Sequence, residues 1–86
     1  MRIRISRHAE VEMRLRQIPI RLLKSALEDP QQIVAERGGR KAYQSQLDFG
    51  KGRMFLLRAI VDDTEDPAIV VTVYRTSKIG KYWRQT

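Results

Sequence analysis

The chain has 86 residues, which is enough for one small domain covering 1–86 and too short for two. It has no cysteine, which excludes a disulfide scaffold and a thiolate metal site, and no apolar run approaches the ~20 residues of a membrane span. Its 17 basic and 10 acidic residues give a net charge of +7, so the composition favours a polyanionic partner such as nucleic acid. No apolar signal core follows Met1–Ile5, so we expect a cytoplasmic protein.

The first third of the chain predicts a short extended segment and two helices. Met1–Ile5 alternates apolar and basic residues and is expected to be an edge strand or arm. Ser6 suits the N-cap of a helix over Arg7–Gln17, and Pro19 stops that helix and starts the next. The predicted apolar stripe of the first helix is His8, Val11, Leu15 and Ile18. The predicted stripe of the second is Ile20, Leu23, Ala26 and Leu27, before Asp29-Pro30 ends it.

From residue 32 onward the apolar period changes to two, which is typical of strands. The predicted strands are Gln32–Arg37, Arg40–Phe49, Arg53–Val61 and Ala68–Arg75. Gly38-Gly39 indicates a hairpin turn between the first two, because glycine supplies the positive φ angles of tight turns. The fold class is therefore α+β, with two N-terminal helices packed on one face of a four-stranded antiparallel sheet.

Alternation within the strands predicts which side chains share a face of the sheet. Leu57, Ala59 and Val61 are expected inward, which puts Arg58 on the other face. In the last strand Ile69, Val71 and Val73 are expected on one face, and Val70, Thr72 and Tyr74 on the other. Arg58 and Tyr74 are therefore predicted to lie on the face that the helices leave less covered.

The closing segment is the main candidate for a functional surface. Its cations are Arg75, Lys78, Lys81 and Arg84, and no acid lies among them. The sequence contains no Gly-rich phosphate loop, no G-x-S-x-G and no HExxH, and it has one histidine. The reaction class that these absences leave is acid–base chemistry in a cationic site. We expect no metal and no cofactor.

Cleavage of RNA suits this set of residues, because the 2′-hydroxyl is an internal nucleophile. His8 is the one side chain that titrates near neutrality and is the expected base. Arg58, Arg75 and Lys78 are expected to stabilise the phosphate. Tyr74 or Tyr82 would position or protonate an oxygen, or stack on a base. This hypothesis requires His8 to lie in the same cationic hollow as the closing segment. The structural alternative is that His8 only caps or packs its helix and that Trp83 covers the edge of the core.

Several motifs together resemble a known family. They are Ser6-Arg7-His8-Ala9, Leu27-Glu28-Asp29-Pro30, Val71-Thr72-Val73-Tyr74, Thr76-Ser77-Lys78 and Lys81-Tyr82-Trp83. They resemble a small bacterial family of domains of unknown function, which itself looks like a relative of the RelE and BrnT toxins in the barnase/RelE-like ribonuclease fold. The resemblance covers the chain from Ile5 to Trp83.

The resemblance implies a RelE-like, metal-independent endoribonuclease toxin of a toxin–antitoxin pair. With the reasoning above, it gives His8, Tyr74, Lys78 and Tyr82 as catalytic candidates and Arg58, Arg75, Ser77, Lys81 and Arg84 as substrate-binding candidates. The expected partners are RNA, including ribosome-bound mRNA, and a cognate antitoxin protein; a homodimer is also compatible, and no membrane is expected. Two alternatives remain open: a nucleic-acid-binding module without chemistry, and a basic interaction domain for an acidic protein.

Overall fold

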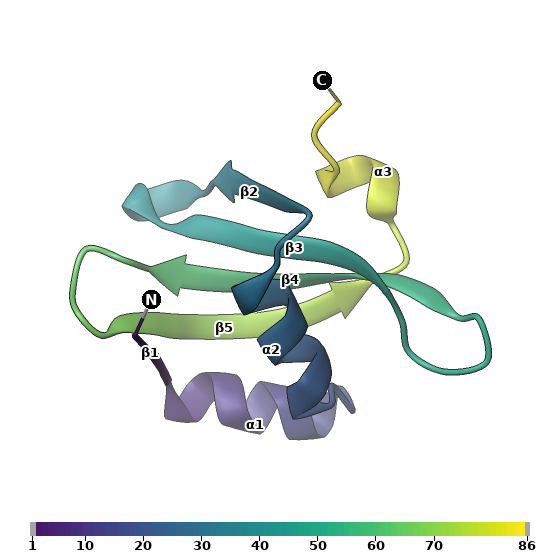
Figure 1. Ribbon diagram of the computed structural model, residues 1–86, viewed down its shortest axis with the longest axis horizontal. Coiled ribbons are helices and arrows are strands. Elements are labelled where there is room, and N and C mark those ends of the chain that lie inside the picture. The colour runs from purple at the N-terminus through teal and green to yellow at the C-terminus, as the bar shows by residue number, and fades with distance from the viewer. Residues whose placement is uncertain (1, 86) are drawn as a thin grey trace.

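The computed structural model describes residues 2–85 and shows a five-stranded mixed sheet with two helices packed on it (Figure 1). The elements are β1 (Ile3–Ile5), α1 (Arg7–Leu15), α2 (Ile20–Glu28), β2 (Gln32–Ala35), the 3₁₀ turn η1 (Arg37–Gly39), β3 (Lys41–Asp48), β4 (Met54–Asp62), β5 (Ala68–Thr76) and α3 (Ile79–Tyr82). The strand order is β1-β5-β4-β3-β2. The α+β class and the two N-terminal helices packed on the sheet are confirmed. The all-antiparallel, four-stranded sheet is wrong, because β1 adds a fifth strand parallel to β5.

Ser6 joins the added strand to the first helix. β1 pairs with Ala68–Val70, and the Ser6 backbone N–H extends this ladder by donating to the Val70 carbonyl at 3.1 Å. The Ser6 hydroxyl donates to the Val71 carbonyl and accepts from the Ala9 N–H, each at 3.0 Å. This predicted N-cap therefore fixes the start of α1 against β5 as well as capping it. None of the helices found between residues 2 and 85 is long and apolar enough to cross a membrane.

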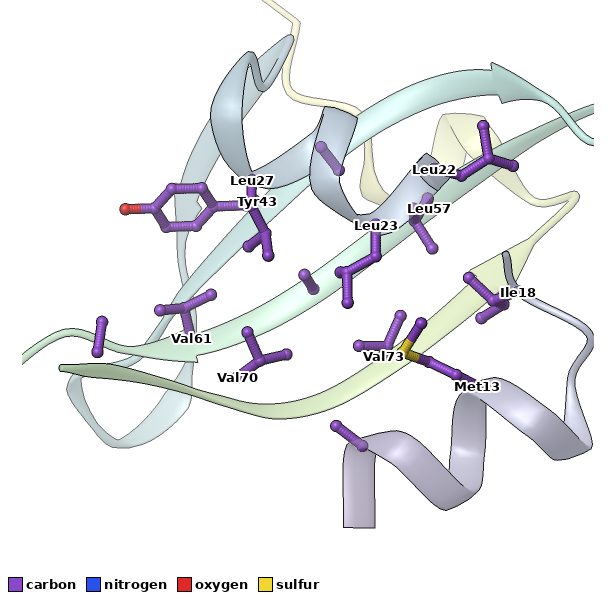
Figure 2. Packing of buried hydrophobic residues seen from close by; sticks show 14 residues of the cluster. Met13, Ile18, Leu22, Leu23, Leu27, Tyr43, Leu57, Val61, Val70 and Val73 are labelled. Carbon is purple, nitrogen blue, oxygen red and sulfur yellow. The ribbon is translucent and has the colours of Figure 1, made fainter. Parts of the chain in front are cut away.

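The hydrophobic core lies between the two helices and one face of the sheet (Figure 2). α1 contributes Ala9 and Met13 to it, whereas Leu15 is 73% exposed and His8 is exposed. The predicted stripe of α1 was wrong because Ala9 and Met13, four residues apart, form the buried stripe of this nine-residue helix. Ile18 is buried as predicted, but it lies beyond the helix end, after Gln17 turns the chain with a φ of 53°. α2 supplies Leu22, Leu23, Ala26 and Leu27, while Ile20 is 49% exposed.

An irregularity in the β4–β5 ladder sets the faces of β5. Ile60 pairs with Thr72 and Val61 with Val70, so Val71 is an extra residue in β5. Val70 therefore joins Val73 in the core, which corrects the expectation that it shares a face with Tyr74. Beyond the bulge the alternation is as predicted, and Arg58 and Tyr74 lie directly opposite one another on the face away from the core.

The corrected stripe of α1 gives a stability prediction. Met13→Ala should lower the free energy of unfolding by about 2–5 kcal/mol, because Met13 is 8% exposed and its loss leaves a cavity against Val73. Leu15→Ala, in the same helix, should change it by less than about 0.5 kcal/mol. Urea unfolding followed by circular dichroism measures both. A larger loss for Leu15→Ala than for Met13→Ala would contradict this packing of α1.

Candidate functional site

Four polar side chains form a row across the sheet on the face opposite the core. Gln32 of β2 pairs with Gln44 of β3, Gln44 with Arg58 of β4, and Arg58 with Tyr74 of β5. Directly opposed residues project from the same face of a sheet, so the register alone brings these groups together. We call these four residues the polar row.

Arg58 is the centre of the polar row. Its Nε donates to Gln44 Oε1 at 2.8 Å, and its Nη1 donates to the Tyr74 hydroxyl at 2.5 Å. Its Nη2 donates to Glu36 Oε1 at 2.6 Å, which completes an ion pair. The Arg58 residue is only 3% exposed, and Gln44 is fully buried. A buried guanidinium is costly unless its charge and donors are matched, and here every nitrogen has an acceptor.

Glu36 supplies the negative charge of the site. It directly follows β2, where its backbone N–H donates to the Arg40 carbonyl at 2.9 Å across the η1 turn. Gly38 and Gly39 have φ of 70° and 75°, so glycine allows the tight reversal that brings the carboxylate back over Arg58. The Glu36 side chain is 28% exposed against 4% for that of Arg58. A solvent-borne ligand therefore reaches the carboxylate more readily than the guanidinium.

The C-terminal segment covers the polar row. The Tyr82 ring of α3 lies over Arg58, with 4.4 Å between its centroid and Cζ, and meets the Tyr74 ring edge-on at 6.1 Å. Gln44 Nε2 donates to the Tyr82 carbonyl at 3.2 Å. The Gln32 amide both donates to the Arg84 carbonyl at 2.7 Å and accepts from the Arg84 N–H at 3.0 Å. Two glutamines thus fasten the basic tail to the sheet through its backbone, which leaves the Arg84 side chain in solvent.

The Tyr74 hydroxyl is the second group of the site that could act on a ligand, and the Tyr74 residue is partly exposed. Burial raises the pKa of Tyr74 above its ordinary value, and the hydrogen bond from Arg58 opposes this only in part. The phenol is therefore protonated at neutral pH. Because the oxygen already accepts from Arg58, and no acceptor for its proton occurs between residues 2 and 85, the O–H can donate to a ligand.

The structure brings together some of the residues that the sequence singled out. Arg58, Tyr74 and Tyr82 are in contact. Lys81 lies beside them, with its Nζ 5.2 Å from the Tyr82 ring centroid. Ser77 and Lys78 are exposed in the link between β5 and α3, where the Lys78 N–H donates to Thr76 Oγ1 at 3.0 Å.

His8 does not join this cluster. It is exposed in the first turn of α1, and its neighbour Ala9 packs with Val73 in the core. Since Val73 and Tyr74 project from opposite faces of β5, α1 lies across the sheet from the Tyr74 hydroxyl. The expected hollow shared by His8 and the closing segment is therefore not formed. The sequence-based hypothesis required His8 in this hollow as the base, and no predicted element fixed it there; the fold instead leaves His8 exposed at the start of α1.

Arg75 is also separated from Tyr74. Its guanidinium carbon lies 4.8 Å from the Phe49 ring centroid and 4.7 Å from that of Phe55, on the helix-covered side of the sheet. Consecutive residues of a strand point to opposite faces, so a strand cannot direct both Tyr74 and Arg75 at one phosphate.

Sequence reasoning missed Glu36, Gln44 and Gln32. Their local pattern gives little signal, because polar residues that alternate with apolar ones, as Gln44 and Gln46 do with Tyr43 and Leu47, are typical of a solvated strand face. Only the register shows that Gln44 lies opposite a buried arginine. Across the described range 2–85, no three acidic or histidine side chains approach closely enough to hold a metal ion.

Comparison with known proteins identifies a family. A search of curated proteins and a search of solved structures each give no match. The family described as "Domain of unknown function (DUF4258)" matches residues 5–75. The match takes in α1, α2 and the whole polar row, and it ends before α3. The chain therefore belongs to the DUF4258 family, a domain of unknown function.

Proposed function

We propose that the protein is a metal-independent endoribonuclease that acts at Glu36, Arg58 and Tyr74. The observation that supports this most directly is the buried Arg58, which holds a carboxylate and a phenol side by side. A base, an acid and a fixed cation are the groups that attack of a 2′-hydroxyl on its phosphate requires. The net charge of +7 and the resemblance to RelE-like ribonucleases support RNA as the substrate.

In the proposed reaction Glu36 accepts the proton of the 2′-hydroxyl as that oxygen attacks phosphorus. The bond from phosphorus to the 5′-oxygen breaks, and Tyr74 donates a proton to the departing oxygen. The products are a 2′,3′-cyclic phosphate and a 5′-hydroxyl, and protons balance when Glu36 returns its proton to solvent and Tyr74 regains one. Arg58 orients both groups and offsets the charge that develops on the phosphate through the low-dielectric interior behind them.

The C-terminal segment supplies the substrate-binding surface in this proposal. Tyr82 offers a ring beside Tyr74 on which a base can stack. Lys81 and Arg84 are exposed on the tail over the polar row, and Ser77 and Lys78 lie where the strand leads into it. These groups would contact the sugar–phosphate backbone of single-stranded RNA. The binding free energy that they contribute is independent of base sequence.

Binding without cleavage is the second candidate function. It is favoured by the burial of Arg58, because each of its nitrogens already has a protein acceptor. In that case the polar row is a structural support for a basic surface. A cleavage assay separates the two candidates, since both predict RNA binding that weakens steeply with salt.

Replacement of the proposed base is the first test. Glu36→Gln should lower the rate of cleavage of single-stranded RNA in the presence of EDTA by about 10²- to 10⁴-fold, because the amide accepts a hydrogen bond but not a proton. Glu28→Gln, an exposed carboxylate of α2, is the matched control and should be unaffected. Denaturing gel electrophoresis of labelled RNA measures the rate. Thermal unfolding by circular dichroism verifies that Glu36→Gln is folded, and Tyr74→Phe provides a second variant with the carboxylate intact.

His8 gives an independent test of the location of the site. His8→Ala should cleave RNA within about twofold of the wild-type rate, because α1 lies on the opposite face of the sheet from the polar row. The same assay measures it at pH 6 and pH 8. Loss of activity in a folded His8→Ala protein would move the reaction centre away from Glu36 and Tyr74.

The biological role proposed here is that of a toxin in a toxin–antitoxin pair, with an acidic protein as its inhibitor. Expression of the wild-type chain in a bacterium should arrest growth, and expression of Glu36→Gln at equal abundance should not. Co-expression of the adjacent gene should relieve the arrest. Growth curves with immunoblots measure this, and unimpeded growth at high wild-type abundance would refute the toxin role while leaving RNA cleavage open.

A further inference from the structure

A second cationic group lies at the end of the sheet where β5 finishes and the β3–β4 hairpin turns. The guanidinium of Arg75 lies over both Phe49 and Phe55, whose rings meet edge-on with centroids 5.5 Å apart at 83°. All three side chains are partly exposed. Figure 1 shows the tip of β5 beside this hairpin, and we call the three residues the Phe–Arg cluster.

Within the described part of the chain, no carboxylate forms an ion pair with the guanidinium of Arg75. The ion pairs within residues 2–85 involve Arg2, Arg16, Lys41 and Arg58, and none involves Arg75. A guanidinium that stacks on rings keeps its in-plane N–H donors free, and those donors match the oxygens of a phosphate.

The hairpin beside Arg75 adds positive charge that is not offset locally. Lys51 and Arg53 are exposed in its turn. Asp48, the acid at the end of β3, accepts from the N–H groups of Gly50 at 2.7 Å and Gly52 at 3.2 Å. Its carboxylate thereby stabilises the turn and does not pair with any of these cations. Aromatic rings surrounded by unpaired cations are the usual composition of a single-stranded nucleic-acid surface.

Along the second half of β5, the edge away from β4 has no strand partner among the described residues. β1 covers only Ala68–Val70, and Ser6 reaches no further than Val71. From Thr72 to Thr76 no other described strand pairs with that edge. Tyr74 and Arg75 leave the strand on opposite faces, so a polyanion that contacts both has to pass round β5.

We propose that the Phe–Arg cluster is a second RNA contact, in which Arg75 binds a phosphate and a neighbouring base stacks on Phe49 or Phe55. The inference rests on the proposed RNA-binding function and adds a site outside the polar row. Single-stranded RNA bound to the polar row would continue round β5 to reach it.

Fluorescence anisotropy with a labelled 16-nucleotide oligouridylate, measured at several salt concentrations, tests the proposal. Arg75→Gln should weaken binding about five- to tenfold and reduce the magnitude of the slope of log K against log salt by about 0.7. Phe49→Leu should weaken binding about fivefold with an unchanged slope, because stacking and not charge is lost. The matched control is Arg7→Gln, an equal loss of charge at the start of α1, near the other end of β5, and it should remain within twofold.

The outcomes separate this inference from the function on which it rests. Wild-type protein that does not bind the oligonucleotide would refute the RNA-binding function itself. Wild-type binding that Arg75→Gln leaves within twofold, or that Arg7→Gln weakens equally, would overturn only the second contact. Equal displacement of the RNA by polyglutamate of matched charge would also overturn it, since a peptide has no bases to stack.

A crosslinking measurement on the unmodified protein avoids dependence on the folding of variants. Ultraviolet irradiation of the complex with an oligonucleotide carrying 5-iodouridine should attach RNA to the peptide that contains Phe49 or Phe55, as read by mass spectrometry. Crosslinks confined to peptides of the polar row and α3 would overturn the proposal.

Discussion

The arrangement of the second half of the chain depends on one buried charge, the guanidinium of Arg58, on the face of the sheet opposite the helices. Arg58 is 3% exposed, and an unpaired guanidinium at that depth would cost several kcal/mol. The fold meets this cost with three acceptors from three different elements: Gln44 of β3, Tyr74 of β5 and Glu36 after β2. The strands must therefore stay in register for the charge to be stable, and the tail that covers Arg58 is held by the same row of amides.

The two faces of the sheet are thus stabilised by different kinds of interaction. The helix-covered face is held by apolar burial, which tolerates substitutions that keep the volume. The polar row is held by directional hydrogen bonds, and no buried side-chain nitrogen or oxygen in the described part of the chain lacks a partner. Such a network fixes the positions of Glu36 and Tyr74, because both are bonded to Arg58, Tyr74 from within β5 and Glu36 from the start of the η1 turn. That rigidity is what acid–base chemistry on a phosphate would require.

The residues that follow period-two alternation were the predictable part of the fold and of the site. Leu57, Ala59 and Arg58 took the faces that their spacing predicts, which placed Arg58 beside Tyr74 correctly. The predicted stripe of α1 and the predicted faces of β5 were wrong for identifiable physical reasons. α1 buries the small Ala9, and hydrophobicity alone does not distinguish that stripe from one containing Leu15. The extra residue Val71 in β5 is specified by pairing with β4, which depends on residues far away in the sequence.

The position of β5 between β1 and β4 constrains the order in which the protein can assemble. Its neighbours are β1, from the first residues of the chain, and β4, so its pairing with β1 joins segments more than 60 residues apart. Long-range pairing of this kind slows folding, because the chain loses loop-closure entropy before the stabilising contacts form. During synthesis on the ribosome, α1 and β1 emerge long before β5 exists, and their apolar side chains have no sheet to cover. The core of this protein can therefore close only after its last strand has been made.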